Sequence, residues 1–225
     1  DAARLKDKAI LVLSSVFCGG KTTQRRFLMA DDPQNREFLV SYTTRLPRPG
    51  EVDGVDYHFL RLGRTEAEAN AEFMRLVDNG DIFEHTRLYG NRYGTPKRQL
   101  EEAVAAGKQL IADVNIEGLW ALKKAYPNQV QGIFLLPPSI EILKARLQKR
   151  LTDVGLALNQ SWAEIEKEKN QHINQALETL KEAPFYDAVI EQQKSRPKAV
   201  YQMIKDALNT PINQTFSRKP PSDER

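Results

Sequence analysis

The feature that most constrains the fold is an apolar run near the beginning of the chain that ends at two consecutive glycines. Residues 8–15 read KAILVLSS, and such a continuous run is typical of a strand that is buried on both faces, as in a parallel sheet. Gly19 and Gly20 then break the chain, and we expect a helix over residues 21–29. A strand–turn–helix unit of this kind predicts an α/β protein.

Strand and helix signals alternate along the rest of the chain. We expect extended segments at residues 38–43, 57–60, 108–114, 131–136 and 186–190, and a small antiparallel hairpin over residues 82–93 with its turn at residues 89–91. Helices are expected at residues 65–77, 96–106, 116–126, 140–150, 162–183 and 197–208. Their predicted N-caps are Thr65, Thr95, Ser139 and Ser161. The pattern predicts a doubly wound α/β core with a mostly parallel sheet flanked by helices, and an antiparallel insertion between about residues 45 and 93.

Composition limits the location and the partners of the protein. The 225 residues suffice for one large domain, and no apolar run approaches the ~20 residues that a membrane-spanning helix needs. The chain begins without a signal-like apolar segment, and its single cysteine, Cys18, fits a reducing compartment. We therefore expect a cytoplasmic protein. The net charge of +3 is too small to indicate binding to nucleic acid.

The turn after the first strand partly matches a phosphate-binding loop of the form G-x-x-x-x-G-K-[ST]. Gly20, Lys21 and Thr22 fit its second half, whereas Ser15 stands in place of the first glycine. In such a loop the backbone N–H groups bind phosphate, the lysine reaches the β- and γ-phosphates, and the hydroxyl binds Mg²⁺. The predicted ATP-binding residues are Gly19, Gly20, Lys21, Thr22 and Thr23. The alternative is a glycine-rich turn with an ordinary lysine at a helix start.

A second motif lies at residues 41–59, which read SYTTRLPRPGEVDGVDYHF. Arg45 and Arg48 lie three residues apart, and two arginines with tyrosine hydroxyls form a phosphate clamp, because a guanidinium fork suits phosphate oxygens. This segment closely resembles the signature S-x-T-T-R-x-P-R-x-G-E-x-x-G-x-D-Y-x-F of guanylate kinases, with every fixed position present. The resemblance extends over about residues 8–208.

The resemblance implies a set of GMP-binding residues. Arg45, Arg48, Tyr57 and Tyr93 would hold the phosphate of GMP. Ser41, Glu84 and Thr95 match positions that read the guanine or line its pocket, with Glu84 accepting from the N1–H and the N2 amine. Asp113 matches a carboxylate near Mg²⁺. Asn115 stands where the family usually carries an aspartate that contacts GMP, and Glu117 stands where glutamine is common.

The resemblance also implies a lid. Arg146 and Arg150 lie one helical turn apart, and arginines at these places close over the ATP phosphates in the family, so we expect them to be catalytic together with Lys21. The third lid arginine of the family falls on His172, and about one helical repeat of extra sequence lies between residues 151 and 168. Gln192 replaces a family asparagine. The alternative for the two arginines is a solvated basic helix face.

We therefore expect a guanylate kinase that uses MgATP, with a P-loop kinase core at residues 8–40, 96–146 and 184–208. The expected GMP-binding subdomain covers residues 41–95, the helical lid residues 147–183 and a disordered tail residues 209–225. Two alternatives stay open. The first is a catalytically weakened domain that binds GMP or phosphorylated peptides, favoured by Ser15, Phe17, Cys18, Asn115 and His172. The second is a kinase for another phosphorylated small molecule. The sequence gives no oligomeric state.

Overall fold

The structure is a computed structural model that describes residues 9–157, 159–192 and 196–209. The chain divides into two compact units. The first comprises Asp1–Ile10 and Asp32–Gln129, and the second comprises Leu11–Asp31 and Val130–Arg225. Residues 210–225 of the expected tail lie outside the described residues.

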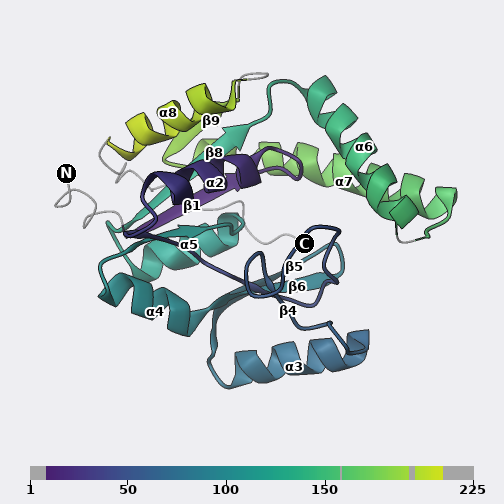
Figure 1. The fold of residues 1–225 in the computed structure, drawn as a ribbon, viewed down its shortest axis with the longest axis horizontal. Coiled ribbons are helices and arrows are strands. Elements are labelled where there is room, and N and C mark those ends of the chain that lie inside the picture. Colours follow the sequence, from purple (N-terminus) through teal and green to yellow (C-terminus); the bar gives the residue numbers. More distant parts are fainter. Residues whose placement is uncertain (1–8, 158, 193–195, 210–225) are drawn as a thin grey trace. The chain divides into compact units, whose positions relative to one another are not determined.

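The larger sheet confirms the predicted parallel α/β core (Figure 1). Its five strands have the order β2-β7-β1-β8-β9. They are β1 (Ile10–Ser15), β2 (Arg36–Phe38), β7 (Gln109–Ala112), β8 (Val130–Leu136) and β9 (Ala188–Glu191). Strand β2 pairs with β7 in parallel, and β8 pairs with β9 in parallel. All residues of β1 and β7 are buried, as expected for a strand that helices cover on both faces.

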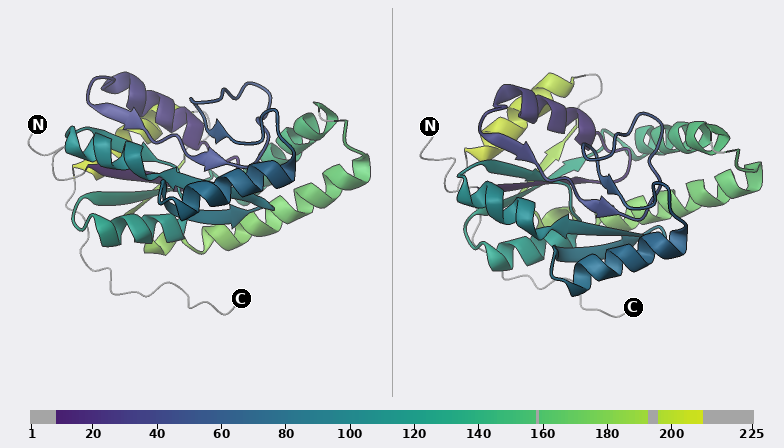
Figure 2. Two further views of the ribbon diagram at one scale, coloured as in Figure 1. Left: turned by 90° about the horizontal axis from the view of Figure 1, so that it is seen from below. Right: turned by 60° about the horizontal axis from the view of Figure 1, so that its bottom comes forward.

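The first unit also carries a second, mixed sheet with the order β4-β3-β6-β5. Its strands are β3 (Tyr42–Thr43), β4 (His58–Phe59), β5 (Ile82–Leu88) and β6 (Asn91–Pro96). β5 and β6 form the predicted antiparallel hairpin, and β3 pairs with β6 in antiparallel and with β4 in parallel. Helix α3 (Glu66–Asp78) packs on this sheet (Figure 2). Its Phe73 and Leu76 form a core with Ile82. The predicted Thr65 cap is confirmed as part of a capping box with Glu68.

Two expectations about the first unit are wrong. Residues 38–43 do not form one strand, because the chain leaves β2 at Phe38 and enters the other sheet at Tyr42. Thr95 does not cap a helix, because it lies in β6, where its side chain bonds a neighbouring strand. Helix α4 (Lys97–Ala105) instead begins after Pro96, which provides no side-chain cap. Helix α5 (Ile116–Ala125) follows β7 as expected.

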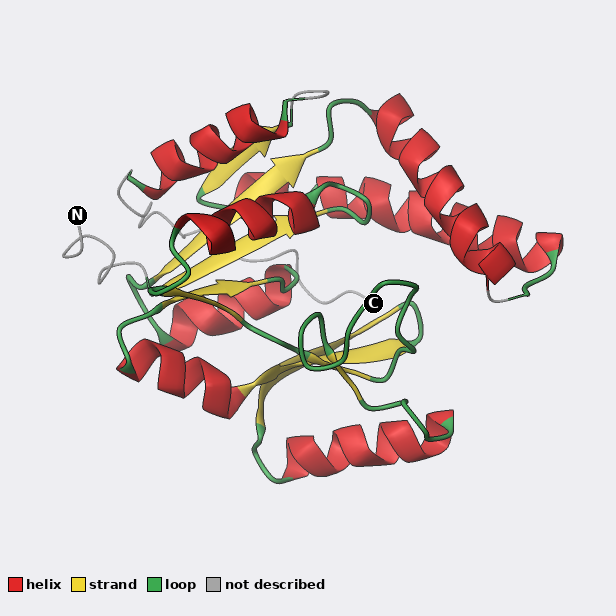
Figure 3. Ribbon diagram, in the orientation of Figure 1, coloured by secondary structure: helices red, strands yellow, loops and turns green. Residues whose placement is uncertain are grey.

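The second unit contains two pairs of helices, which Figure 3 shows in red. Helix α2 (Lys21–Asp31) packs with α8 (Pro197–Leu208), where Gln24 donates to the Pro197 carbonyl at 3.0 Å and the rings of Phe27 and Tyr201 lie 5.7 Å apart. Helices α6 (Ile140–Ala157) and α7 (Trp162–Leu180) form a long antiparallel pair.

The boundaries of the long pair differ from expectation. Helix α6 continues beyond Arg150 to Ala157, whereas α7 ends at Leu180 and is followed by the short helix η1 (Ala183–Phe185). The Ser161 capping box is confirmed, and Ser139 accepts from the backbone of α6 at 3.2 Å. Within the described residues, none of the helices is both long enough and apolar enough to cross a membrane.

Candidate active site

One carboxylate braces the two arginines of the predicted phosphate clamp, and all three residues lie in one loop. Arg45 donates to both carboxylate oxygens of Glu51, at 2.8 and 3.1 Å, and to the Leu46 carbonyl at 2.7 Å. The backbone N–H of Arg48 donates to Glu51 at 2.7 Å, and its Nη1 lies 3.9 Å from that carboxylate. Burial raises the pKa of the Glu51 carboxyl, but these bonds outweigh burial and hold the pKa below its usual range. Glu51 therefore stays ionised and orients the clamp.

Aromatic rings form the second wall of the clamp. The Cζ atom of Arg45 lies 5.3 Å from the ring centroid of Tyr57 and 5.4 Å from that of Phe59. Tyr57 packs edge-on against Tyr93, with 5.9 Å between centroids. Burial raises the pKa of Tyr57 well above its ordinary value, and the neighbouring Asp113 and Tyr93 raise it further. Tyr57 therefore keeps its phenolic proton and can donate a hydrogen bond to an anion.

One donor atom of the Arg45 guanidinium, Nε, is buried without a partner among the described residues. Burial lowers the pKa of the guanidinium, but the hydrogen bond from Arg45 to Glu51 and the nearby Tyr93 outweigh burial and raise it. A charged donor without an acceptor is costly, and an oxyanion satisfies it well. The clamp is therefore suited to a phosphate group.

Glu84 lies at an irregularity of the β5–β6 hairpin. The pairing register shifts between Ile82 and His85, and such a bulge redirects the side chains that it carries. Thr95 Oγ1 on the opposite strand donates to Glu84 at 2.5 Å. Burial raises the pKa of Glu84, the Thr95 bond lowers it, and the charge of Glu117 raises it, with a net rise. Glu84 is thus a half-buried carboxylate held in one orientation.

The start of α5 completes this region of the first unit. Asn115 is the N-cap of α5, and its Oδ1 accepts from the Gly118 N–H at 3.0 Å. Its Nδ2 donates to Glu117 at 2.8 Å and to Thr86 at 3.3 Å. The Asn115 amide is therefore engaged within the protein, and the exposed Glu117 carries the charge at this place.

Ser41 and Asp113 come from the ends of neighbouring segments. Ser41 is buried and precedes β3, and its carbonyl accepts from the His58 N–H at 2.9 Å. Asp113 is half-buried and directly follows β7. All predicted GMP-binding residues thus belong to the first unit: Ser41, Arg45, Arg48, Tyr57, Glu84, Tyr93, Thr95 and Asn115.

The turn after β1 belongs to the second unit and has an unusual residue order. The Val16 carbonyl accepts from the Gly19 N–H at 2.9 Å, so Phe17 and Cys18 are the central residues of a β-turn. Cys18 has a φ of 61°, in the left-handed region where a side chain costs about 1–2 kcal/mol. A Cβ at Gly19 would clash with Ser15 Oγ and lie 2.7 Å from the Val16 carbonyl oxygen. Only glycine fits at position 19.

Distant segments brace this turn. Ser15 Oγ donates to the Leu135 carbonyl of β8 at 2.7 Å, so the serine at the first glycine position is buried and satisfied. Gln192 donates from Nε2 to the Gly19 carbonyl and packs against Gly20, which has a φ of 90°. The main chain of the turn is therefore held by β8 and by the residue that follows β9.

Helix α2 begins at Lys21, immediately after this turn. Its first turn contains no acidic residue, so the positive end of the helix dipole favours an anion. Lys21 is half-buried, and Thr22 and Thr23 are exposed. The predicted ATP-binding residues thus adjoin one another at one helix N-terminus.

The predicted lid arginines lie on α6. Arg146 is half-buried and Arg150 is exposed. His172, at the position of the expected third lid arginine, is 3% exposed and packs against Phe17, with 5.0 Å between ring centroids. The position therefore supplies no exposed cation.

A family model for guanylate kinase matches residues 7–209. The chain belongs to the guanylate kinase family. It is 42% identical over 143 residues to a guanylate kinase of Gluconobacter oxydans, covering 64% of each chain. It is 37% identical over 185 residues to one of Geobacter sulfurreducens, covering 82% of this chain and 81% of the relative. A crystal structure of guanylate kinase from Anaplasma phagocytophilum superposes with a TM-score of 0.64 and 28% identity, covering 89% of this chain and 84% of the other.

Some of these alignments leave part of the relatives unmatched. The chain spans 64% of the length of the Gluconobacter protein and 62% of a guanylate kinase of Maricaulis maris, to which it is 40% identical. The family match at residues 7–209 includes residues of both units.

Two residues in contact with predicted site residues are not among the sequence-based predictions. Glu51 is a fixed position of the signature, and an acid shortly after two arginines is itself a signal that the arginines have a carboxylate partner. Gly118 was not singled out, yet a Cβ there would lie 3.3 Å from the Glu84 carboxyl carbon and clash with Val114. Nothing in the local sequence indicates that contact.

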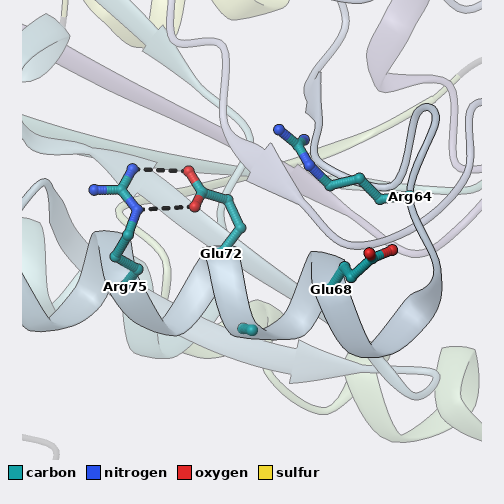
Figure 4. A pocket seen from close by; sticks show the side chains of 5 residues that line it. Arg64, Glu68, Glu72 and Arg75 are labelled. Atoms are coloured by element: carbon teal, nitrogen blue, oxygen red, sulfur yellow. Dashed lines mark hydrogen bonds and ion pairs between the residues drawn. The ribbon is translucent and has the colours of Figure 1, made fainter.

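A surface hollow of about 340 Å³ lies along α3 and is separate from these residues (Figure 4). Arg75 donates twice to Glu72 there, at 2.8 Å each. Its lining consists of Arg64, Glu68, Ala71, Glu72 and Arg75. None of the predicted site residues lines it.

Proposed function

We propose that this chain transfers the γ-phosphoryl group of ATP to GMP and releases ADP and GDP. The observation that carries the proposal is the pairing, within one unit, of a braced arginine–tyrosine clamp with a half-buried carboxylate at Glu84. The clamp suits a phosphate monoester, and the carboxylate suits a base that offers two adjacent donors. Guanine offers the N1–H and the N2 amine, whereas adenine lacks that pair.

GMP binding uses the charges described above. Arg45 and Arg48 pair with the phosphate oxygens, and the hydroxyls of Tyr57 and Tyr93 donate to them. Ser41, Thr95 and Asn115 line the base pocket around Glu84. Residues 41–95 therefore serve as the GMP-binding subdomain, inserted in a core of residues 8–40, 96–146 and 184–208.

ATP binding uses the turn and the start of α2. The N–H groups after Gly19 and Gly20 cradle the phosphates, Lys21 neutralises the β- and γ-phosphate oxygens, and Thr22 and Thr23 offer hydroxyls. The lid of residues 147–183 and the arginines Arg146 and Arg150 exclude water, so that transfer to GMP outcompetes hydrolysis. A GMP phosphate oxygen forms the new P–O bond as the bond to the bridging oxygen of ADP breaks.

Thr22 and Asp113 are the proposed Mg²⁺ ligands, and each has a suitable donor atom. Thr22 presents an exposed hydroxyl and Asp113 a half-buried carboxylate, both of them oxygen ligands of the kind that Mg²⁺ takes. Among the described residues, no group of three or more His, Cys, Asp or Glu side chains could form a metal cage. This suits an ion that keeps water and nucleotide phosphates as most of its ligands. When bound, Mg²⁺ neutralises developing phosphate charge.

The single cysteine, Cys18, supports a reducing compartment, and we place the reaction in the cytoplasm. The small-molecule substrates ATP and GMP are the proposed partners. Retention of Lys21, Thr22 and Asp113 favours the enzyme over a binding module without turnover.

The test is a coupled ADP-release assay with ATP, Mg²⁺ and GMP, with AMP as the control acceptor. GMP-dependent turnover that disappears in Lys21→Ala supports the proposal. GMP binding by calorimetry without turnover contradicts it and favours a binding module. Turnover with a different phosphorylated acceptor, but not with GMP, favours the second alternative.

A further inference from the structure

Two departures from the family pattern contact one another in the second unit. Phe17 lies in the phosphate turn, and His172 lies on α7, where a lid arginine was expected. Their ring centroids are 5.0 Å apart with a tilt of 49°. Phe17 and His172 are therefore distant in sequence and adjacent in space.

His172 forms a fixed backing for this contact. The ring is 3% exposed, and its Nδ1 lies 2.9 Å from the Glu168 carbonyl oxygen. A carbonyl oxygen only accepts, so Nδ1 carries a proton. The imidazole is therefore held in orientation by its own helix, and its ring is available for packing against Phe17.

Arg150 contacts the same phenyl ring. Its Cζ lies 5.4 Å from the Phe17 centroid, within the distance at which a guanidinium is attracted to an aromatic ring. Arg150 is otherwise exposed on α6. A long exposed side chain has many rotamers, and a ring contact restricts them.

We propose that Phe17 is a positioning residue that holds the Arg150 guanidinium beside the phosphate turn, with His172 supporting the ring from α7. The inference rests on the proposed function, because it assigns Arg150 to the transferring phosphoryl group. The contact with the Phe17 ring restricts the conformations of Arg150. It replaces part of the ordering that additional lid arginines would provide. Because the Arg150 side chain is already ordered, it loses less conformational entropy when it binds the phosphates in the transition state.

The test compares Phe17→Leu with Phe27→Leu. Both phenylalanines belong to the second unit and to tilted aromatic pairs, but Phe27 contacts Tyr201 and lies outside the site. We expect Phe17→Leu to lower kcat about 5- to 10-fold with little change in the Kd of ATP, which is the signature of an interaction used in the transition state. We expect Phe27→Leu to leave kcat unchanged. Phe17→Tyr should keep most of the wild-type kcat, because the aromatic ring is retained.

A double-mutant cycle with Arg150→Gln shows whether the ring acts through the arginine. The account expects Phe17→Leu to have almost no further effect on kcat once Arg150 is replaced. Additive losses in the cycle contradict the inference. So does a raised Kd for ATP with an unchanged kcat, which would indicate only a disturbed phosphate turn.

Nuclear magnetic resonance of the Arg150 Nε–Hε group gives a readout that needs no activity. The Phe17 ring current shifts this resonance in the wild-type chain, and Phe17→Leu removes the shift whereas Phe27→Leu does not. A resonance that Phe17→Leu leaves in place contradicts the inference. If the wild-type chain shows the shift but no GMP-dependent turnover, the proposed function fails while the contact stands.

Discussion

The phosphate clamp of the first unit and the phosphate turn of the second are stabilised in different ways. The clamp is braced from within its own loop, because Glu51 bonds Arg45 and Arg48 a few residues away. The turn is braced from a distance, by Leu135, Gln192 and His172. A locally braced motif keeps a recognisable sequence, whereas a motif braced from a distance can change when its remote partners change with it.

The largest expected effect lies in the turn. Lys21→Ala removes the cation that neutralises the transferring phosphates, and we expect kcat to fall by about 10²–10³-fold. The Kd of GMP, measured by calorimetry, stays the same because the clamp belongs to the other unit. Lys205→Ala is the control, since Lys205 pairs with Asp31 at 3.6 Å and lies 5.5 Å from the Tyr201 ring centroid, away from the turn. A Lys21→Ala protein with near-normal kcat would show that the turn is not the ATP site.

The next effect tests the local brace of the clamp. Glu51→Gln weakens the charged bonds to Arg45, and we expect KM for GMP to rise about 10- to 100-fold while the Kd of ATP is kept. Glu72→Gln is the matched control, because it breaks a bidentate pair with distances of 2.8 Å on the surface of α3. Exposed pairs contribute only about 0–1 kcal/mol. Equal effects of the two variants on KM for GMP would refute the special role of Glu51.

A smaller effect concerns pH and Glu84. Burial raises the pKa of Glu84, so its ionised form is lost as pH falls through a window above the ordinary carboxyl range. The charged carboxylate therefore costs stability at neutral pH, and acidification relieves this cost. Guanine recognition has the opposite dependence, because the protonated form loses an acceptor, and KM for GMP rises on acidification.

Thr95→Val tests this assignment. The Thr95 bond lowers the pKa of Glu84, so its removal moves the acid limb of kcat/KM for GMP to higher pH, with a loss of a few-fold at mildly acidic pH. Thr179→Val is the control, since that hydroxyl donates within its own helix, to the Gln175 carbonyl at 2.9 Å. An acid limb that stays in place would mean that another group titrates.

The smallest effect concerns Cys18. Its φ of 61° favours glycine, and we expect Cys18→Gly to raise the free energy of unfolding by up to about 1 kcal/mol, partly offset by the greater freedom of glycine in the unfolded chain. Cys18→Ala keeps a Cβ and should give no gain. Denaturant unfolding measures the free energy of unfolding of both variants. Equal values would contradict backbone strain at Cys18.

Sequence predicted what is encoded locally. The buried run of β1, the Thr65 and Ser161 capping boxes and the β5–β6 hairpin all follow from neighbouring residues, and all are confirmed. The signature at residues 41–59 identified the family for the same reason.

The wrong predictions concern residues whose local structure depends on partners that are distant in sequence. Thr95 has the chemistry of an N-cap, but a cross-strand bond to Glu84 places it in β6. Residues 38–43 have strand composition throughout, yet the chain changes sheets within them. The contact of Phe17 with His172 and the packing of Gly118 near Glu84 join segments that no local pattern connects.

The most direct test of the account follows the phosphoryl group itself. ATP labelled with ³²P at the γ-phosphate is mixed with the full chain, Mg²⁺ and GMP in a single turnover. The account predicts that the label appears in GDP and that little appears in inorganic phosphate. Label that remains in ATP, or that appears only as inorganic phosphate, would contradict transfer to GMP by this divergent turn.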